Sequence, residues 1–122
     1  MNANIIADKS SSFAVRVVNL TRFLKKNKVE AILINQLLRS GTSIAANVHE
    51  ASASFTRKEF SAKLSISLKE ARETNYWLKL LFDSKTISEK EYKSISDDCN
   101  ELEKILFVIL RTVKNNPSNK NP

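Results

Sequence analysis

The stretch SEKEYKSISDDCNELEKILFVILRTVK, residues 88–114, decides the fold. Its apolar side chains recur in alternating steps of three and four residues, which is the period of one face of an α-helix. That face consists of Tyr92, Ile95, Cys99, Leu102, Leu106, Ile109 and Val113. Because such a stripe packs against other helices at shallow angles, the stretch predicts one long helix of a helical bundle.

Three earlier segments show the same spacing, and residues that make turns are almost absent. The chain of 122 residues has one glycine, Gly41, and two prolines, Pro117 and Pro122. A sheet protein of this length needs many tight turns, whereas a few long helices need almost none. The sequence therefore predicts an all-α protein, with one domain over residues 1–114 and a disordered tail over 115–122. The expected helices cover residues 9–26, 28–54, 57–84 and 89–114.

Capping boxes, in which Ser or Thr precedes Glu by three residues, mark three of the helix starts. The pattern occurs at Thr56 to Glu59, at Ser88 to Glu91 and, more loosely, at Asn27 to Glu30. The connections between helices are only a few residues long, so consecutive helices must be antiparallel neighbours. The expected architecture is an antiparallel up-down-up-down four-helix bundle.

The composition restricts the partners and the compartment. Twenty basic and 13 acidic residues give a formal net charge of +7, which favours polyanions or acidic partners but also serves solubility. The single cysteine, Cys99, excludes an intramolecular disulfide and favours a reducing compartment. We see no signal sequence, and the longest strongly apolar run, residues 105–110, is too short to span a membrane. We therefore expect a cytoplasmic protein with no membrane contact.

No residue pattern indicates an active site. Di-iron bundles need Glu-x-x-His motifs, and the only histidine, His49, does not follow a Glu by three residues. Cys99 lies on the apolar face, where a cysteine is usually a buried hydrophobe with a raised pKa. A single glycine cannot make a phosphate-binding loop. We expect no catalytic, cofactor-binding or metal-binding residues, and thus not an enzyme.

Basic residues gather towards the two ends of the expected bundle. The candidates for nucleic-acid binding are Arg22, Lys25, Lys26 and Lys28 at one end, and Arg57 and Lys58 at the other. Lysines at helix ends also solubilise a bundle and complement helix dipoles, so both interpretations stay open. No platform of aromatic side chains for stacking bases is evident. Any binding should therefore be to the nucleic-acid backbone, weakly sequence-specific and strongly salt-dependent.

A second candidate surface is a stripe beside the core face of residues 57–84. The stripe consists of Ile66, Glu70, Glu73 and Trp77. Half-buried carboxylates need partners. Three cations are candidates for that role: Arg39, Lys69 and Arg72. The stripe is either a solvated charged face or an ion-pair network that fixes helix register or a subunit interface, with the tryptophan as its anchor.

Two long motifs resemble a known family. LRSGTSIAANVHEA, residues 38–51, and LKEARETNYWL, residues 68–78, are similar to the four-helix bundle proteins of the 23S rRNA intervening-sequence family. That family is related to the accessory variability proteins of diversity-generating retroelements, and the resemblance covers about residues 13–114. The family-motif or interface candidates are Arg39, Ser43, Asn47, Glu50, Lys69, Glu70, Glu73, Tyr76 and Trp77.

The resemblance implies a homo-oligomer, a ring-like pentamer of bundles with a basic surface. For retroelement members it implies binding to nucleic acid and to a reverse transcriptase, and for intervening-sequence members an open reading frame within an rRNA gene insertion. We expect a non-enzymatic oligomeric scaffold that binds RNA or DNA through basic residues, alone or with a protein partner such as a reverse transcriptase. The alternative is a protein–protein interaction module that does not bind nucleic acid.

Overall fold

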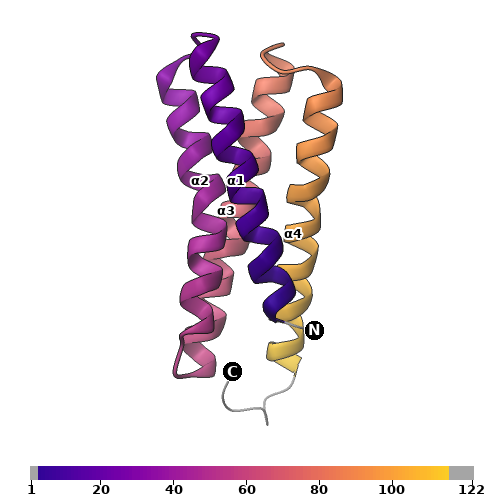
Figure 1. The fold of residues 1–122 in the computed structure, drawn as a ribbon. Helices are drawn as coiled ribbons and strands as arrows, with labels where there is room; N and C mark the ends of the chain where they lie inside the picture. The colour runs from indigo at the N-terminus through magenta and orange to yellow at the C-terminus, as the bar shows by residue number, and fades with distance from the viewer. Residues whose placement is uncertain (1–2, 116–122) are drawn as a thin grey trace.

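The computed structural model describes residues 3–115, which fold into four α-helices joined by short turns (Figure 1). The helices are α1 (Ala3–Lys26), α2 (Ala31–Ser52), α3 (Arg57–Asp83) and α4 (Glu89–Asn115). Consecutive helices run in opposite directions. The α1–α2 and α3–α4 turns therefore share one end of the bundle, the two-turn end, and the α2–α3 turn lies at the other, the one-turn end. The predicted all-α four-helix bundle is confirmed.

The apolar faces of the four helices meet in one continuous core. The buried apolar residues of α4 all belong to the stripe expected from its sequence: Ile95, Cys99, Leu102, Leu106 and Ile109. The outer faces of the helices carry the charged residues. None of the four described helices is long and apolar enough to cross a membrane.

Small residues let α2 approach both of its neighbours closely. A Cβ atom at Gly41 would lie 2.7 Å from a methyl carbon of Val17 on α1, so glycine is the residue that fits without a shift. On the side that faces α3, the buried hydroxyl oxygens of Ser40 and Thr74 lie 2.9 Å apart. Packing inside the bundle therefore accounts for the small residues at these positions of α2.

The ends of the chain differ from the expected bounds. Helix α1 begins at Ala3 rather than at residue 9. Ile6 extends the apolar face of α1 towards its N-terminus and is only 1% exposed, so packing stabilises the additional residues. Helix α4 ends at Asn115, the last described residue. The remainder of the tail expected over residues 115–122 lies outside the described residues.

Each turn at the two-turn end contains a lysine in the left-handed backbone conformation. Lys28 follows α1 with φ 60°, and Lys85 follows α3 with φ 62°. In both turns the next N–H donates to a carbonyl five residues back, as in a Schellman motif. These hydrogen bonds join Val29 N to Leu24 O at 3.1 Å and Thr86 N to Leu81 O at 2.8 Å.

Helix α2 was expected to start at residue 28, and the left-handed conformation of Lys28 shows that this start was wrong. A helix cannot run through Lys28 because its φ is positive. The helix begins at Ala31, and its N-cap residue, Glu30, makes no side-chain capping hydrogen bond. Asn27 was expected to cap α2, but its side-chain amide donates backwards to the carbonyl of Phe23 at 2.8 Å. The loose capping box at this position was therefore wrong.

Candidate functional site

A polar cluster joins the outer faces of α2 and α3. Arg39 of α2 pairs with two carboxylates of α3: its Nη1 lies 3.2 Å from Oε1 of Glu70, and its Nη2 pairs with Glu73. The indole N–H of Trp77 donates to Oε2 of Glu73 at 2.9 Å. Arg39 also donates to the side-chain oxygen of Gln36 at 3.3 Å. These five side chains form a network that links the two helices.

The two other candidate partners of the stripe do not reach it. Arg72 lies on the α4 side of α3, where its Nε is 3.7 Å from a carboxylate oxygen of Glu103. Lys69 is exposed and makes no ion pair with any residue that the structure describes. Arg39 is therefore the cation that neutralises the carboxylates of the stripe.

Charges in the cluster stabilise one another. The indole N–H of Trp77 lowers the pKa of Glu73 below its ordinary value of 4.5, while burial opposes this shift and Arg39 reinforces it. The pKa of Arg39 is raised, chiefly by its hydrogen bond to Glu73. Glu73 is therefore ionised at neutral pH. A carboxylate held in this state suits a fixed ion pair rather than proton transfer.

Exposed apolar side chains accompany this ion-pair network. Tyr76 is 59% exposed and meets Trp77 edge to face, with ring centroids 5.0 Å apart and an interplanar angle of 71°. Trp77 is half-buried against the core. Ile66, at the other end of the stripe, is also exposed. Apolar side chains that flank a charged centre make this face a candidate assembly surface.

The other family-motif positions of α2 stabilise the helix or its contact with α3. The side-chain amide of Asn47 donates to the backbone carbonyl of Ser43 at 2.9 Å, within α2. Glu50 forms an ion pair with Lys63 of α3, with Oε1 and Nζ 2.7 Å apart. The pKa of Lys63 is raised, mainly by this hydrogen bond. The Glu50–Lys63 ion pair supports the same α2–α3 seam as Arg39.

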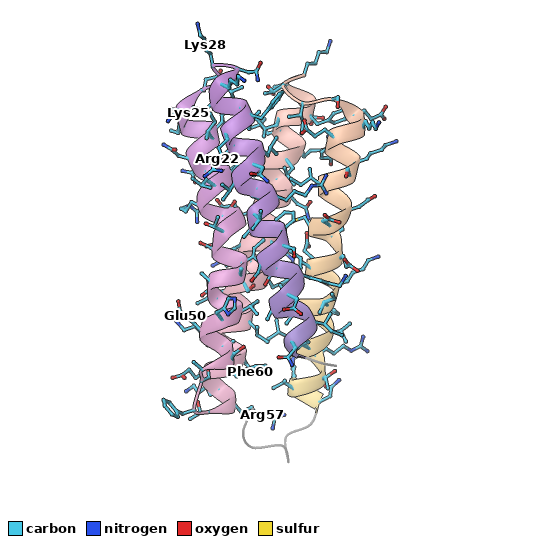
Figure 2. The ribbon with its side chains drawn as sticks, in the orientation of Figure 1. Arg22, Lys25, Lys28, Glu50, Arg57 and Phe60 are labelled. Carbon is cyan, nitrogen blue, oxygen red and sulfur yellow. The ribbon has the colours of Figure 1, made fainter. Side chains whose placement is uncertain are left out.

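The first basic group lies at the two-turn end, and all of its side chains are exposed (Figure 2). Its members, the basic end cluster, are Arg22, Lys25, Lys26 and Lys28. No acidic side chain within residues 3–115 forms an ion pair with any of them. The cluster therefore presents four cations whose charge no neighbouring carboxylate neutralises.

The second basic group lies at the opposite end of the bundle (Figure 2). Arg57 donates to the backbone carbonyl of Val113, which joins the start of α3 to the last turn of α4. Lys58 is exposed. A helix of 24 residues, such as α1, is about 36 Å long. The six candidates therefore form two separate surfaces rather than one, and Arg57 also has a structural role.

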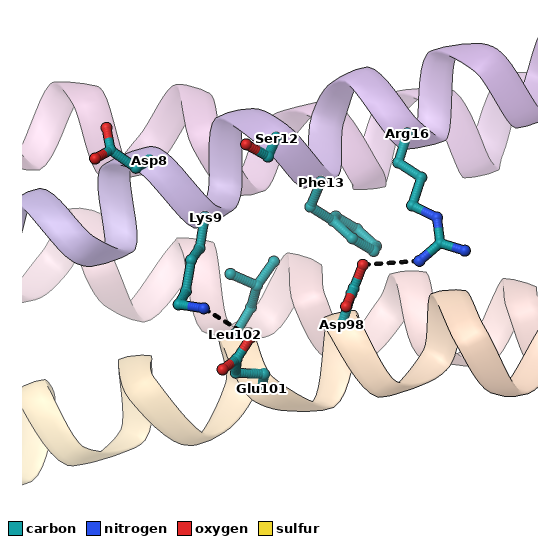
Figure 3. A pocket seen from close by; sticks show the side chains of 8 residues that line it. All are labelled: Asp8, Lys9, Ser12, Phe13, Arg16, Asp98, Glu101 and Leu102. Atoms are coloured by element: carbon teal, nitrogen blue, oxygen red, sulfur yellow. Dashed lines mark hydrogen bonds and ion pairs between the residues drawn. The ribbon is translucent and has the colours of Figure 1, made fainter.

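A groove of about 400 Å³ runs between α1 and α4 (Figure 3). Lys9 pairs with Glu101 across it at 3.2 Å, and Arg16 pairs with Asp98 at 2.8 Å. Arg16 also donates to the hydroxyl of Ser94 at 2.6 Å. These contacts stabilise the packing of α1 against α4.

The cysteine and the histidine have separate partners. Burial raises the pKa of the Cys99 thiol well above its ordinary value, and its Sγ donates to the carbonyl of Ala71 at 3.3 Å. His49 instead contacts Ser11 of α1, with Nε2 and Oγ 3.2 Å apart. The two therefore do not form a nucleophile–base pair. Within residues 3–115, no three side chains of His, Cys, Asp or Glu are grouped to hold a metal ion.

The sequence did not single out one aromatic residue near the one-turn end. Phe107 of α4 is 50% exposed and lies beside Arg111 and Lys114 on the outside of the bundle. It falls within the apolar run 105–110, so composition alone places it in the core. The available signal was the period, because the core stripe passes through Leu106 and Ile109 and leaves Phe107 outside.

Together, these features define an antiparallel four-helix bundle with ion-pair seams between its helices and unneutralised cations at its ends. A family model described as 23S rRNA-intervening sequence protein matches residues 2–108. The chain therefore belongs to that family, which confirms the resemblance of its two long motifs.

A solved structure agrees with this assignment. It is described as a protein of unknown function from the S23 ribosomal protein family of Bacteroides thetaiotaomicron VPI-5482. The two chains are 46% identical, and the match covers 91% of this chain and 99% of the other with a TM-score of 0.87. The comparison with curated proteins finds no match.

Proposed function

We propose that the protein is a non-enzymatic, homo-oligomeric scaffold of the cytoplasm that binds RNA or DNA through its basic end cluster. The observation that carries the proposal is the set Arg22, Lys25, Lys26 and Lys28. These four cations fall within seven residues of sequence, and no described acid pairs with them. Lysine and arginine side chains that neutralise phosphates release the counterions condensed on the nucleic acid, which drives binding. The net charge of +7 adds long-range attraction.

The backbone at the two-turn end supports the proposal. Lys28 and Lys85 both adopt the left-handed conformation that glycine adopts without steric cost. Such backbone strain in other proteins is concentrated at functional sites. A lysine in each turn adds a cation to the same end of the bundle, on either side of the core.

RNA is the first ligand to test. The family description names an intervening sequence of 23S rRNA. The +7 charge and the basic end cluster suit contacts with the phosphate backbone, so we expect little preference for sequence.

A filter-binding titration at about 50 mM and 200 mM salt tests the proposal. Labelled RNA should be retained at low salt, and its affinity should fall linearly with salt concentration on logarithmic axes. The Lys25→Glu/Lys28→Glu variant should lose most of this affinity. The control variant Lys104→Glu reverses a charge on the side of the bundle and should lose much less affinity per reversed charge. No retention at low salt, or retention that salt does not weaken, would contradict the proposal.

Assembly is the second part of the proposal. The stripe around Trp77 combines exposed apolar side chains with a fixed ion-pair centre, and the family resemblance suggests a pentamer. Light scattering at micromolar concentration should then give a mass near five times 13.8 kDa. A monomer mass would exclude the oligomeric scaffold.

The exposed ring of Tyr76 beside Trp77 favours an alternative, a protein–protein module without nucleic-acid binding. A reverse transcriptase is a partner that the family resemblance suggests. In this alternative, nucleic-acid affinity is negligible from the outset. Replacing Lys25, Lys26 and Lys28 with Glu should then leave capture of the partner intact.

A further inference from the structure

A groove of about 620 Å³ lies between α3 and α4 near the one-turn end. Leu68 and Leu110 form its apolar floor, and the half-exposed ring of Phe107 forms one wall. Polar residues complete the rim: Arg72, Arg111, Lys114 and Asn115. No acidic residue of the described chain lines the groove, so it has an apolar centre within a basic rim.

The rim cations differ in how far they are neutralised. Arg72 lies 3.7 Å from Glu103 and shares that carboxylate with Asn75. Arg111 and Lys114 are exposed, and neither forms an ion pair with a residue of the range 3–115. They follow Phe107 at four and seven residues, so the three side chains lie on one face of α4 over successive turns of about 5.4 Å.

The shape of the apolar surface favours a flat ligand. Leu68 is only 8% exposed and Leu110 is partly buried, so Phe107 is the most exposed apolar side chain of the groove. An amphipathic helix of a partner needs a stripe of several exposed apolar side chains, whereas a single base needs one ring. Residues 116–122 of this chain contain Lys120 and no acid, so charge does not favour them as the occupant.

We propose that this groove is a subsite for single-stranded nucleic acid, in which Phe107 stacks on one unpaired base while Arg111 and Lys114 contact the flanking phosphates. The inference rests on the proposed nucleic-acid binding and adds a preference for single strands. Bases in a duplex are already stacked on one another, whereas unpaired bases are available to an aromatic side chain.

Two probes separate stacking from charge: a uridine RNA of about 12 nucleotides, and inorganic polyphosphate, which carries the charges without bases. Phe107→Ala should weaken RNA binding by about 5- to 150-fold, the range for one lost base stack. The variant should bind polyphosphate as the wild type does. Phe107→Trp should retain RNA affinity. Val108→Ala, which trims the adjacent exposed residue, is the matched control and should change neither affinity.

A second variant keeps the test decisive if Phe107→Ala does not fold. Arg111→Gln/Lys114→Gln should lower the salt slope of single-strand binding by about 1.4, because each phosphate contact contributes about 0.7. An unchanged slope, or equal losses in Phe107→Ala and Val108→Ala, would overturn the subsite. An acidic amphipathic peptide that requires Phe107 while RNA does not would assign the groove to a protein partner and also overturn it.

The test separates the two proposals. If the wild type binds neither probe, the proposed nucleic-acid function fails and the subsite fails with it. If the wild type binds both probes and Phe107→Ala still binds RNA like the wild type, the subsite fails while binding through the basic end cluster stands.

Discussion

Gly41 packs directly against Val17, so α1 and α2 lie close together at the glycine. A Cβ at position 41 would lie 2.7 Å and 2.8 Å from the two methyl carbons of Val17. That valine is buried and β-branched, so it cannot rotate out of the way. Gly41→Ala should lower the free energy of unfolding, because overpacking a core costs about 1–3 kcal/mol and the higher helix propensity of alanine offsets at most about 1 kcal/mol of that cost. Urea denaturation measures this change.

The double variant Val17→Ala/Gly41→Ala is the control for that substitution. Truncating Val17 removes the clashing methyl groups, so the second substitution should cost less in this background than in the wild type. A single Gly41→Ala variant as stable as the wild type would show that the two helices tolerate a wider separation.

Glu73 should contribute to stability in a way that depends on pH. Its pKa is lowered in the folded protein, first by Trp77. A carboxyl of this kind stabilises the fold above its unfolded pKa, and the contribution is lost as the pH falls through the folded value. The loss should therefore occur below about pH 4.5. The side chain is 36% exposed, so solvent screening limits the effect to under about 1 kcal/mol.

Chemical denaturation at several pH values tests this prediction. Glu73→Gln should flatten the decline in stability below pH 4.5, because the amide no longer titrates. Glu101→Gln is the matched control, since Glu101 forms an exposed ion pair with Lys9 on a different seam. If the stability of Glu73→Gln falls with pH as steeply as that of the wild type, the ion-pair network does not stabilise the carboxylate of Glu73.

Two of the three expected capping residues cap the start of a helix, and the third does not. Thr56 accepts a hydrogen bond from the N–H of Glu59 at 3.0 Å, and Ser88 accepts one from Glu91 at 3.1 Å. Thr56→Ala and Ser88→Ala should each cost about 1 kcal/mol of stability. Asn27→Ala should cost less, because Asn27 caps no helix start. Thermal unfolding of the three variants checks the order, and an equal loss for Asn27→Ala would contradict the structure of the α1–α2 turn.

Local signals explain which elements were predictable. The caps at Thr56 and Ser88 were confirmed because a capping box depends on residues only three positions apart. The start of α2 was wrong because Lys28 occupies a left-handed position where a sequence pattern expects glycine. A lysine gives no sequence signal of that backbone geometry.

The sequence predicted which helix face carries the candidate site, but not which residues form its ion pairs. The helical period placed Glu70 and Glu73 on one stripe, yet Arg39, Lys69 and Arg72 were equally plausible partners. The choice depends on how α2 and α3 are rotated about their axes, which packing decides. The selected ion pairs therefore appear only in the structure.

Across the whole molecule, the topology determines how the charge is distributed. The two connections that contain left-handed lysines lie at the same end of the bundle (Figure 1). That end also carries the basic end cluster, while carboxylates along the sides are engaged in ion pairs between helices. The proposed polyanion surface therefore follows from chain topology as much as from the net charge.

The most direct test of the account is RNA binding by the Lys28→Gly/Lys85→Gly variant. Glycine adopts a positive φ without steric cost, so the variant should be as stable as the wild type or more stable, by up to about 1 kcal/mol per site. It also lacks two cations of the two-turn end. Because Lys28 belongs to the basic end cluster, the account predicts weaker RNA binding and a salt slope for single strands lower by at least about 0.7. A stable variant with unchanged affinity and slope would contradict it.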